Sequence, residues 1–187
     1  VIAGAGAGAG ASIAPLDYCA AQGLVILRYF RLLIAPYGFT VDPPVGTFAP
    51  AWLAVLAIAF VALKRQRWLL AGLVLLLPSS SIFPASDLAA DRRMYLPLGA
   101  FAAAAGLLLR PIRTRWLAAV AVLLVALSVH RTWVWSSEER LWSEAVERAP
   151  RKVRPRIQLA RAVGGERAVQ LLAEARVVAP EYPNIPA

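Results

Sequence analysis

The chain has 187 residues, of which 59% are hydrophobic, and its mean hydropathy is +0.61. Soluble domains are about 45–50% apolar, and the apolar residues here form long blocks, which favours an integral membrane protein over one soluble domain. The formal net charge is +9, but the densest basic clusters flank apolar blocks, so we interpret them as membrane anchors and expect no nucleic-acid partner.

Residues 1–15 are a Gly/Ala-rich, low-complexity start. Each glycine lowers helix propensity by about 1 kcal/mol, so we expect weak order here. The stretch has neither the basic region nor the cleavage site of a signal peptide. A start at Val1 inside this repeat indicates either a cut chain that retains the tail of an earlier membrane helix or a low-complexity linker.

Residues 16–36 are predicted to form an amphipathic helix that lies in the membrane interface. The run stops at Pro36, and Asp17 is expected to cap its beginning. Arg28 and Arg31 are three residues apart, so they share a helix face. Two arginines in mid-bilayer would cost roughly 5–7 kcal/mol, and a helix among the head groups avoids this cost. The alternative is a true membrane span whose arginines have partners.

Residues 37–135 are predicted to be a membrane bundle of about four spans. The region begins with a loop rich in Pro and Gly. The last apolar run has roughly 20 residues and would be about 30 Å long as a helix, which matches the hydrocarbon core of a bilayer. Tryptophans at both of its ends suit the two membrane interfaces. The four apolar runs cover residues 51–63, 68–77, 94–109 and 116–135.

The charges between these runs predict the orientation of the bundle. The turns at 64–67 and 110–115 each hold three basic residues and no acid, whereas the loop at 84–93 balances two Asp with two Arg. The positive-inside rule places the two basic turns in the cytosol. We therefore expect a multi-pass protein of the cytoplasmic membrane, with the loop at 84–93 and the C-terminal domain in the periplasm or outside the cell.

Residues 136–187 alternate charged and apolar side chains, which is typical of amphipathic helices. The spacing predicts one helix that ends at Pro150, and two more over 154–163 and 166–178. A Gly-Gly pair separates the last two helices.

Two stretches of this domain have the same spacing, Trp142-x-x-Ala145-x4-Pro150 and Leu172-x-x-Ala175-x4-Pro180. With Ala168 they resemble the second helix of a tetratricopeptide repeat, in which small alanines let two helices cross closely. The period between the prolines is 30 residues, against the usual 34 or so. An ordinary helical hairpin is the alternative. Fewer than three repeats rarely stand alone, so we expect this domain to continue or to lean on the membrane part.

The membrane part carries a second resemblance. Ser79-Ser80-Ser81-Ile82-Phe83-Pro84 is followed by Asp87 and by Asp91-Arg92-Arg93-Met94-Tyr95-Leu96-Pro97. This order is similar to a segment of the transmembrane and tetratricopeptide-repeat O-mannosyltransferases and their bacterial relatives, in which a serine-rich turn leads into an acid–Arg–x–x–Tyr–Leu–Pro motif. The stretch from Gln22 to Asp42 and the junction from Arg131 to Trp142 look similar too, so the resemblance covers about residues 16–180 in the right order.

The resemblance implies a C-type glycosyltransferase fold and the transfer of a sugar from a polyprenyl-phosphate donor to protein Ser or Thr on the external side of the membrane. It also implies that the repeat domain receives acceptor or partner proteins. The catalytic acid of that family lies in the first external loop, which no segment of this chain matches. We therefore assign no catalytic residue and expect no turnover by this chain alone. The competing hypothesis is a membrane-anchored repeat adaptor without chemistry.

The candidate site residues are those that would hold the donor phosphate at the external end of a span. A guanidinium forks onto a pair of phosphate oxygens, and a tyrosine can add a hydroxyl donor. An aspartate there would hold an arginine in place or assist a metal. The candidates are Arg92, Arg93, Tyr95 and Asp91, with Arg28 and Arg31 as further ligands of the same phosphate.

Each of these residues also has a simpler interpretation. The acid, the arginines and the tyrosine of the first group suit a plain interfacial anchor, and the other two arginines suit contact with anionic lipid. The sequence has one cysteine, no metal-spaced cluster and no Gly-rich phosphate loop, so we expect no cofactor, and a need for a divalent metal stays open.

Overall fold

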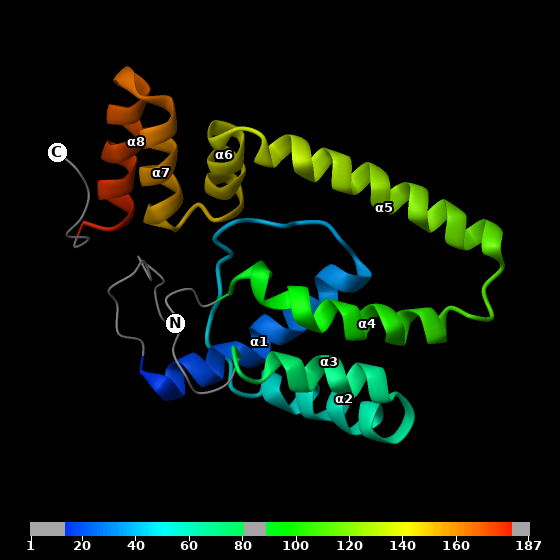
Figure 1. The fold of residues 1–187 in the computed structure, drawn as a ribbon. Coiled ribbons are helices and arrows are strands. Elements are labelled where there is room, and N and C mark those ends of the chain that lie inside the picture. The colour runs from blue at the N-terminus through cyan, green and yellow to red at the C-terminus, as the bar shows by residue number, and fades with distance from the viewer. Residues whose placement is uncertain (1–13, 81–88, 181–187) are drawn as a thin grey trace.

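The computed structural model describes residues 14–80 and 89–180, and over these residues α-helix is the only regular structure besides one short 3-10 turn. The predicted all-α class is therefore confirmed for the described chain. Helices α1 to α4 lie together, α5 stands apart from them, and α6 to α8 form a separate group at one end (Figure 1). Nearly all of the low-complexity start and the first half of the loop at 84–93 lie outside the described residues.

Helix α1 spans Pro15–Ile34 and ends just before Pro36. Proline suits the first helical position because the N–H that it lacks would have no partner there. The predicted cap at Asp17 is wrong, since the residue before the helix is Ala14 and Asp17 lies exposed within the first turn. A carboxylate in that turn still interacts favourably with the helix dipole.

Three helices of the predicted four-span bundle are shorter than a membrane span, so the structure does not confirm four spans. Helices α2 (Ala51–Arg65), α3 (Arg67–Leu76) and α4 (Tyr95–Leu108) have 15, 10 and 14 residues. At 1.5 Å per residue they reach about 23, 15 and 21 Å, less than the roughly 30 Å hydrocarbon core. Helix α5 (Thr114–Trp135) has 22 residues and is the one described helix long and apolar enough to cross a membrane. The 3-10 turn η1 (Asp91–Met94) leads into α4.

Helix α1 is central to the packing of the bundle. One face contributes Val25 and Tyr29 to a cluster with residues of α3, α4 and the segment before η1. Ile26 joins a second cluster with α2 and α3. Helices α3 and α4 meet so closely that a Cβ on Gly72 would lie 2.3 Å from the ring of Phe101. The buried members of the two clusters are Val25, Tyr29, Leu76, Ala89 and Phe101, and Ile26, Val55, Ala62 and Leu73.

The C-terminal helices α6 (Glu138–Arg148), α7 (Val153–Val163) and α8 (Gly165–Val178) pack each on the next in chain order. Ala145 and Ala175 are completely buried, as expected for small residues where helices cross closely. A glycine pair with φ of +64° and +60° makes the sharp turn between α7 and α8, because positive φ is strained for other residues.

The loop between α1 and α2 ties the bundle to the C-terminal helices. Asp42 in this loop forms an ion pair with Lys152, which lies just before α7, and both side chains are 16% exposed. The Arg148 guanidinium donates a hydrogen bond to the carbonyl oxygen of Phe39. The guanidinium of Arg131, near the end of α5, lies 5.8 Å from the centroid of the Phe39 ring. Figure 1 shows this loop passing close to α6.

Candidate functional site

A row of polar side chains on α1 faces the interior of the bundle. Tyr18, Gln22 and Tyr29 lie four and seven residues apart, which places them on one side of the helix, and each is at most 2% exposed. Buried hydroxyl groups require hydrogen-bond partners. The Tyr18 hydroxyl donates to the carbonyl oxygen of Ser79 at 3.0 Å, and the Tyr29 hydroxyl donates to that of Ala90 at 2.9 Å.

Two arginines and an aspartate complete this cluster. Arg28 Nη1 donates to Asp91 Oδ1 at 2.8 Å, and the Arg28 side chain is only 14% exposed. Arg93 Nη1 donates to the Tyr18 hydroxyl at 3.0 Å. Because Asp91 and Arg93 both lie in η1, this short turn brings both of their side chains to α1. The two segments that carry the resemblance therefore meet and exchange hydrogen bonds.

The cluster retains unused capacity to bind a polar ligand. Arg28 Nη2 and Ser80 Oγ are buried, and neither has a hydrogen-bond partner among the described residues. The described side chains of Arg28, Arg93 and Asp91 carry a formal net charge of +1. Two guanidinium groups with tyrosine hydroxyls beside them suit an anion with several oxygens, because charge-assisted hydrogen bonds are stronger than neutral ones.

The structure brings together three of the six candidate residues, namely Arg28, Asp91 and Arg93. Arg31 lies elsewhere, because three residues rotate a helix by about 300° and leave it about 60° from Arg28. Its Nη2 donates to the carbonyl oxygen of Tyr37 at 3.4 Å, and its guanidinium lies 5.3 Å from the centroid of the Tyr37 ring. Tyr95 begins α4 and is 82% exposed. The backbone of Arg92 is part of η1, but its side chain is outside the described part.

Tyr18, Tyr29 and Ser80 belong to or adjoin the cluster but were not predicted from the sequence as site residues. A signal for the two tyrosines exists, because they share the helix face of Val25 and Ile26, and a tyrosine on a buried face must place its hydroxyl against a partner. No local pattern identifies that partner, which lies 61 residues away in both cases.

Among the described residues, no group of three His, Cys, Asp or Glu side chains could hold a metal ion. In comparisons with protein-family models, curated proteins and solved structures, the chain matches none of them.

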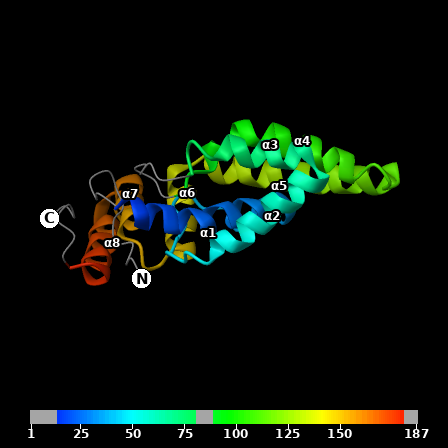
Figure 2. The same ribbon diagram turned by 90° about the horizontal axis from the view of Figure 1, so that it is seen from below.

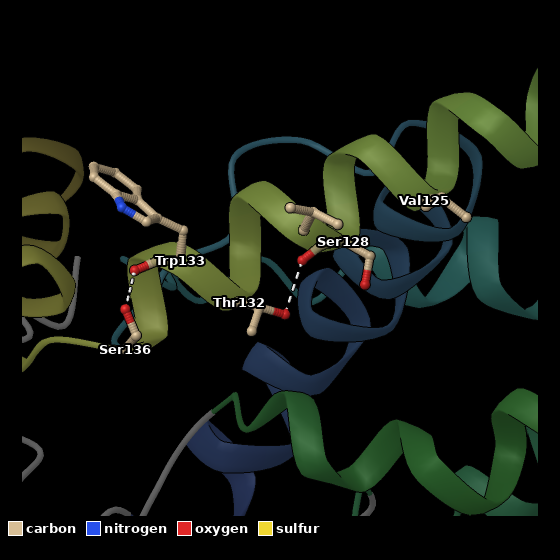
Figure 3. Close-up of a pocket in the computed structure, with 6 residues that line it drawn as sticks. Val125, Ser128, Thr132, Trp133 and Ser136 are labelled. Carbon is tan, nitrogen blue, oxygen red and sulfur yellow. Dashed lines mark hydrogen bonds between the residues drawn. The ribbon is translucent and has the colours of Figure 1, made fainter.

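A concave surface, separate from the cluster, lies on one face of α5 (Figure 3). It is an open depression of about 480 Å³, lined by α5 and by Ser136 directly after it. Its hydroxyl groups turn back to their own helix: Thr132 donates to the carbonyl oxygen of Ser128 at 3.0 Å, and Ser136 donates to that of Trp133 at 2.8 Å. The depression thus offers apolar surface and few free polar groups, and we do not assign it a ligand.

Proposed function

We propose that this chain belongs to a membrane glycosyltransferase that transfers a sugar from a polyprenyl-phosphate donor to protein Ser or Thr. The observation that carries the proposal is the convergence of Arg28, Asp91 and Arg93, which come from both segments similar to the O-mannosyltransferases. If these residues were only interfacial anchors, each side chain could reach the lipid head groups without meeting the others. A shared phosphate site requires that they lie together. The roles follow from the contacts: the two arginines hold the donor phosphate, and Asp91 orients Arg28.

The membrane placement in this proposal rests on α5. Only 6% of the apolar stretch of this helix is buried within the protein. A large exposed apolar surface is unfavourable in water, and a bilayer covers it. In the proposal, α2, α3 and α4 are further spans that are too short to cross as plain helices. The long basic side chains in the turns beside them reach from the helix ends to the head groups. The cluster and the helices α6 to α8 then share the external side, where α6 to α8 receive the protein acceptor.

The proposal is tested by sugar transfer in membranes that contain the protein of the complete reading frame. The substrate is a radiolabelled polyprenyl-phosphate sugar, and the readout is label on protein Ser and Thr. We expect Arg93→Ala to lower transfer by about 10- to 100-fold, because a hydrogen bond to a charged group contributes about 1.5–3 kcal/mol. The matched control is Arg113→Ala, an exposed arginine directly before α5 and outside both the cluster and α6 to α8, for which we expect unchanged transfer.

Normal transfer by the double variant Arg28→Ala plus Arg93→Ala would remove the phosphate role of the cluster. A whole protein that transfers no sugar, but whose α6 to α8 segment captures a protein partner, would support the membrane-anchored adaptor instead. Donor concentration should be varied, because loss of a phosphate ligand raises the KM for the donor, whereas general misfolding lowers the amount of active protein at every concentration.

A further inference from the structure

Six basic side chains gather at one end of the molecule. The turn between α2 and α3 and the turn between α4 and α5 lie at the same end in both views, opposite to α6, α7 and α8 (Figures 1 and 2). All six side chains are exposed. The sequence has no acid from residue 43 to 86 or from 92 to 137, so no carboxylate of α2 to α5 or of the two basic turns offsets this charge. We name this surface the cationic end; it consists of Lys64, Arg65, Arg67, Arg110, Arg113 and Arg115.

Aromatic side chains lie beside both basic turns. Trp68 follows the first turn and is 52% exposed, and Trp116 follows the second and is 60% exposed. The Arg115 guanidinium lies 5.7 Å from the centroid of the Trp116 ring, and the Lys64 ammonium lies 5.7 Å from that of Phe60. Tryptophan next to a basic residue at the end of an apolar helix is typical of the head-group region of a membrane.

We infer that the cationic end binds the head groups of anionic phospholipids in the leaflet that it faces. The charges complement this partner, since lipid phosphates without a compensating amine attract clustered Lys and Arg near the surface. An acidic protein or a nucleic acid fits less well, because the basic residues adjoin apolar helix surface that such partners would leave uncovered. The inference relies on the membrane placement of α5 and is independent of sugar transfer.

The test measures lipid binding to the purified chain in micelles of an uncharged detergent. Native mass spectrometry gives the apparent Kd of phosphatidylglycerol and of phosphatidylcholine, two lipids with the same tails. We expect phosphatidylglycerol to bind at least about tenfold more tightly, since several cations act on its net charge. The triple variant Arg110→Gln, Arg113→Gln, Arg115→Gln should lose most of this preference.

A second triple variant serves as the matched control. Arg151→Gln, Arg161→Gln and Arg167→Gln remove the same charge from exposed positions in the α6 to α8 region, and the lipid preference should persist. Equal binding of both lipids by the unaltered chain would overturn the inference, as would an equal loss of preference in both triple variants. Tight binding of poly-glutamate without any preference for phosphatidylglycerol would overturn it in favour of an acidic protein partner. None of these readouts depends on a sugar donor.

Discussion

Tyr29 shows how a single hydroxyl group joins two distant segments. Its side chain is 2% exposed and donates to the carbonyl oxygen of Ala90 at 2.9 Å. Tyr29→Phe would leave that buried carbonyl without its donor, which costs about 1–3 kcal/mol. For a chain of this size such a loss lowers the Tm by roughly 2–4 °C per kcal/mol. Thermal unfolding in detergent, followed by circular dichroism, measures the change.

The control for this prediction is Tyr37→Phe, which alters a tyrosine that is 65% exposed. We expect its Tm to equal that of the unaltered protein. If both variants have the same Tm as the unaltered protein, the hydroxyl of Tyr29 does not hold the segment before α4.

At the scale of single residues, the sequence indicates candidates but not their pairing. Arg28, Asp91 and Arg93 are candidates because they suit a donor phosphate at the external end of a span, and the structure brings the three together. Arg31 was selected for the same reason but faces Tyr37. Sequence spacing gives the approximate helix face of a residue, whereas a rotation of about 60° decides which neighbour it meets. The hydrogen bonds of Tyr18 depend on tertiary packing and leave no local signal.

At the scale of elements, the contact between α3 and α4 depends on one glycine. A Cβ on Gly72 would lie 2.3 Å from the Phe101 ring, so Gly72→Ala forces that ring or the helix to move. Overpacking of this kind costs about 1–3 kcal/mol, which outweighs the gain of up to about 1 kcal/mol in helix propensity. We expect a lower Tm for Gly72→Ala in the same unfolding measurement.

Gly106→Ala is the matched control, because Gly106 lies in α4 and a Cβ there meets nothing within 4 Å. Its stability should stay the same or rise by up to about 1 kcal/mol, since alanine restricts the unfolded chain and favours helix. A rise in Tm for both variants would show that α3 and α4 do not pack as closely as described.

The positions of prolines predicted helix ends well. The lengths of the apolar runs predicted helix lengths less well. Helix α1 lies between Pro15 and Pro36, and α3 ends two residues before Pro78, as expected for residues that cannot continue a helix. The apolar run over 94–109 extended the third span beyond α4 by one residue at each end. An apolar run shows which residues avoid water, whereas the pattern of backbone hydrogen bonds determines the residue at which a helix ends.

At the scale of the whole molecule, the contacts that join the C-terminal helices to the α1–α2 loop had no sequence signal. The ion pair between Asp42 and Lys152 joins residues 110 positions apart. No sequence pattern links these two residues, and only the fold makes them neighbours. By contrast, it was predictable that the two basic turns lie at the same end. Two helices, α3 and α4, separate the turns, and two antiparallel helices return the chain to the end from which it started (Figures 1 and 2).

The orientation across the membrane is the remaining prediction at this scale. In a Cys19→Ala background, which removes the one native thiol, Gln66→Cys should resist an impermeant maleimide added to intact cells. Glu166→Cys, at an exposed position near the start of α8, should react. The physical reason is the positive-inside rule, which retains the basic turn around Gln66 in the cytosol. Permeabilised cells, in which both positions should react, provide the control.

The reverse labelling pattern would place Arg28 and Arg93 on the cytosolic side of the bilayer. An external transfer from a polyprenyl-phosphate donor could not then use this cluster, and the proposed function would fail. The preference of the cationic end for phosphatidylglycerol would survive that result, because it is measured in micelles without sidedness. The two experiments therefore separate a wrong orientation from a wrong assignment of the basic turns to anionic lipid.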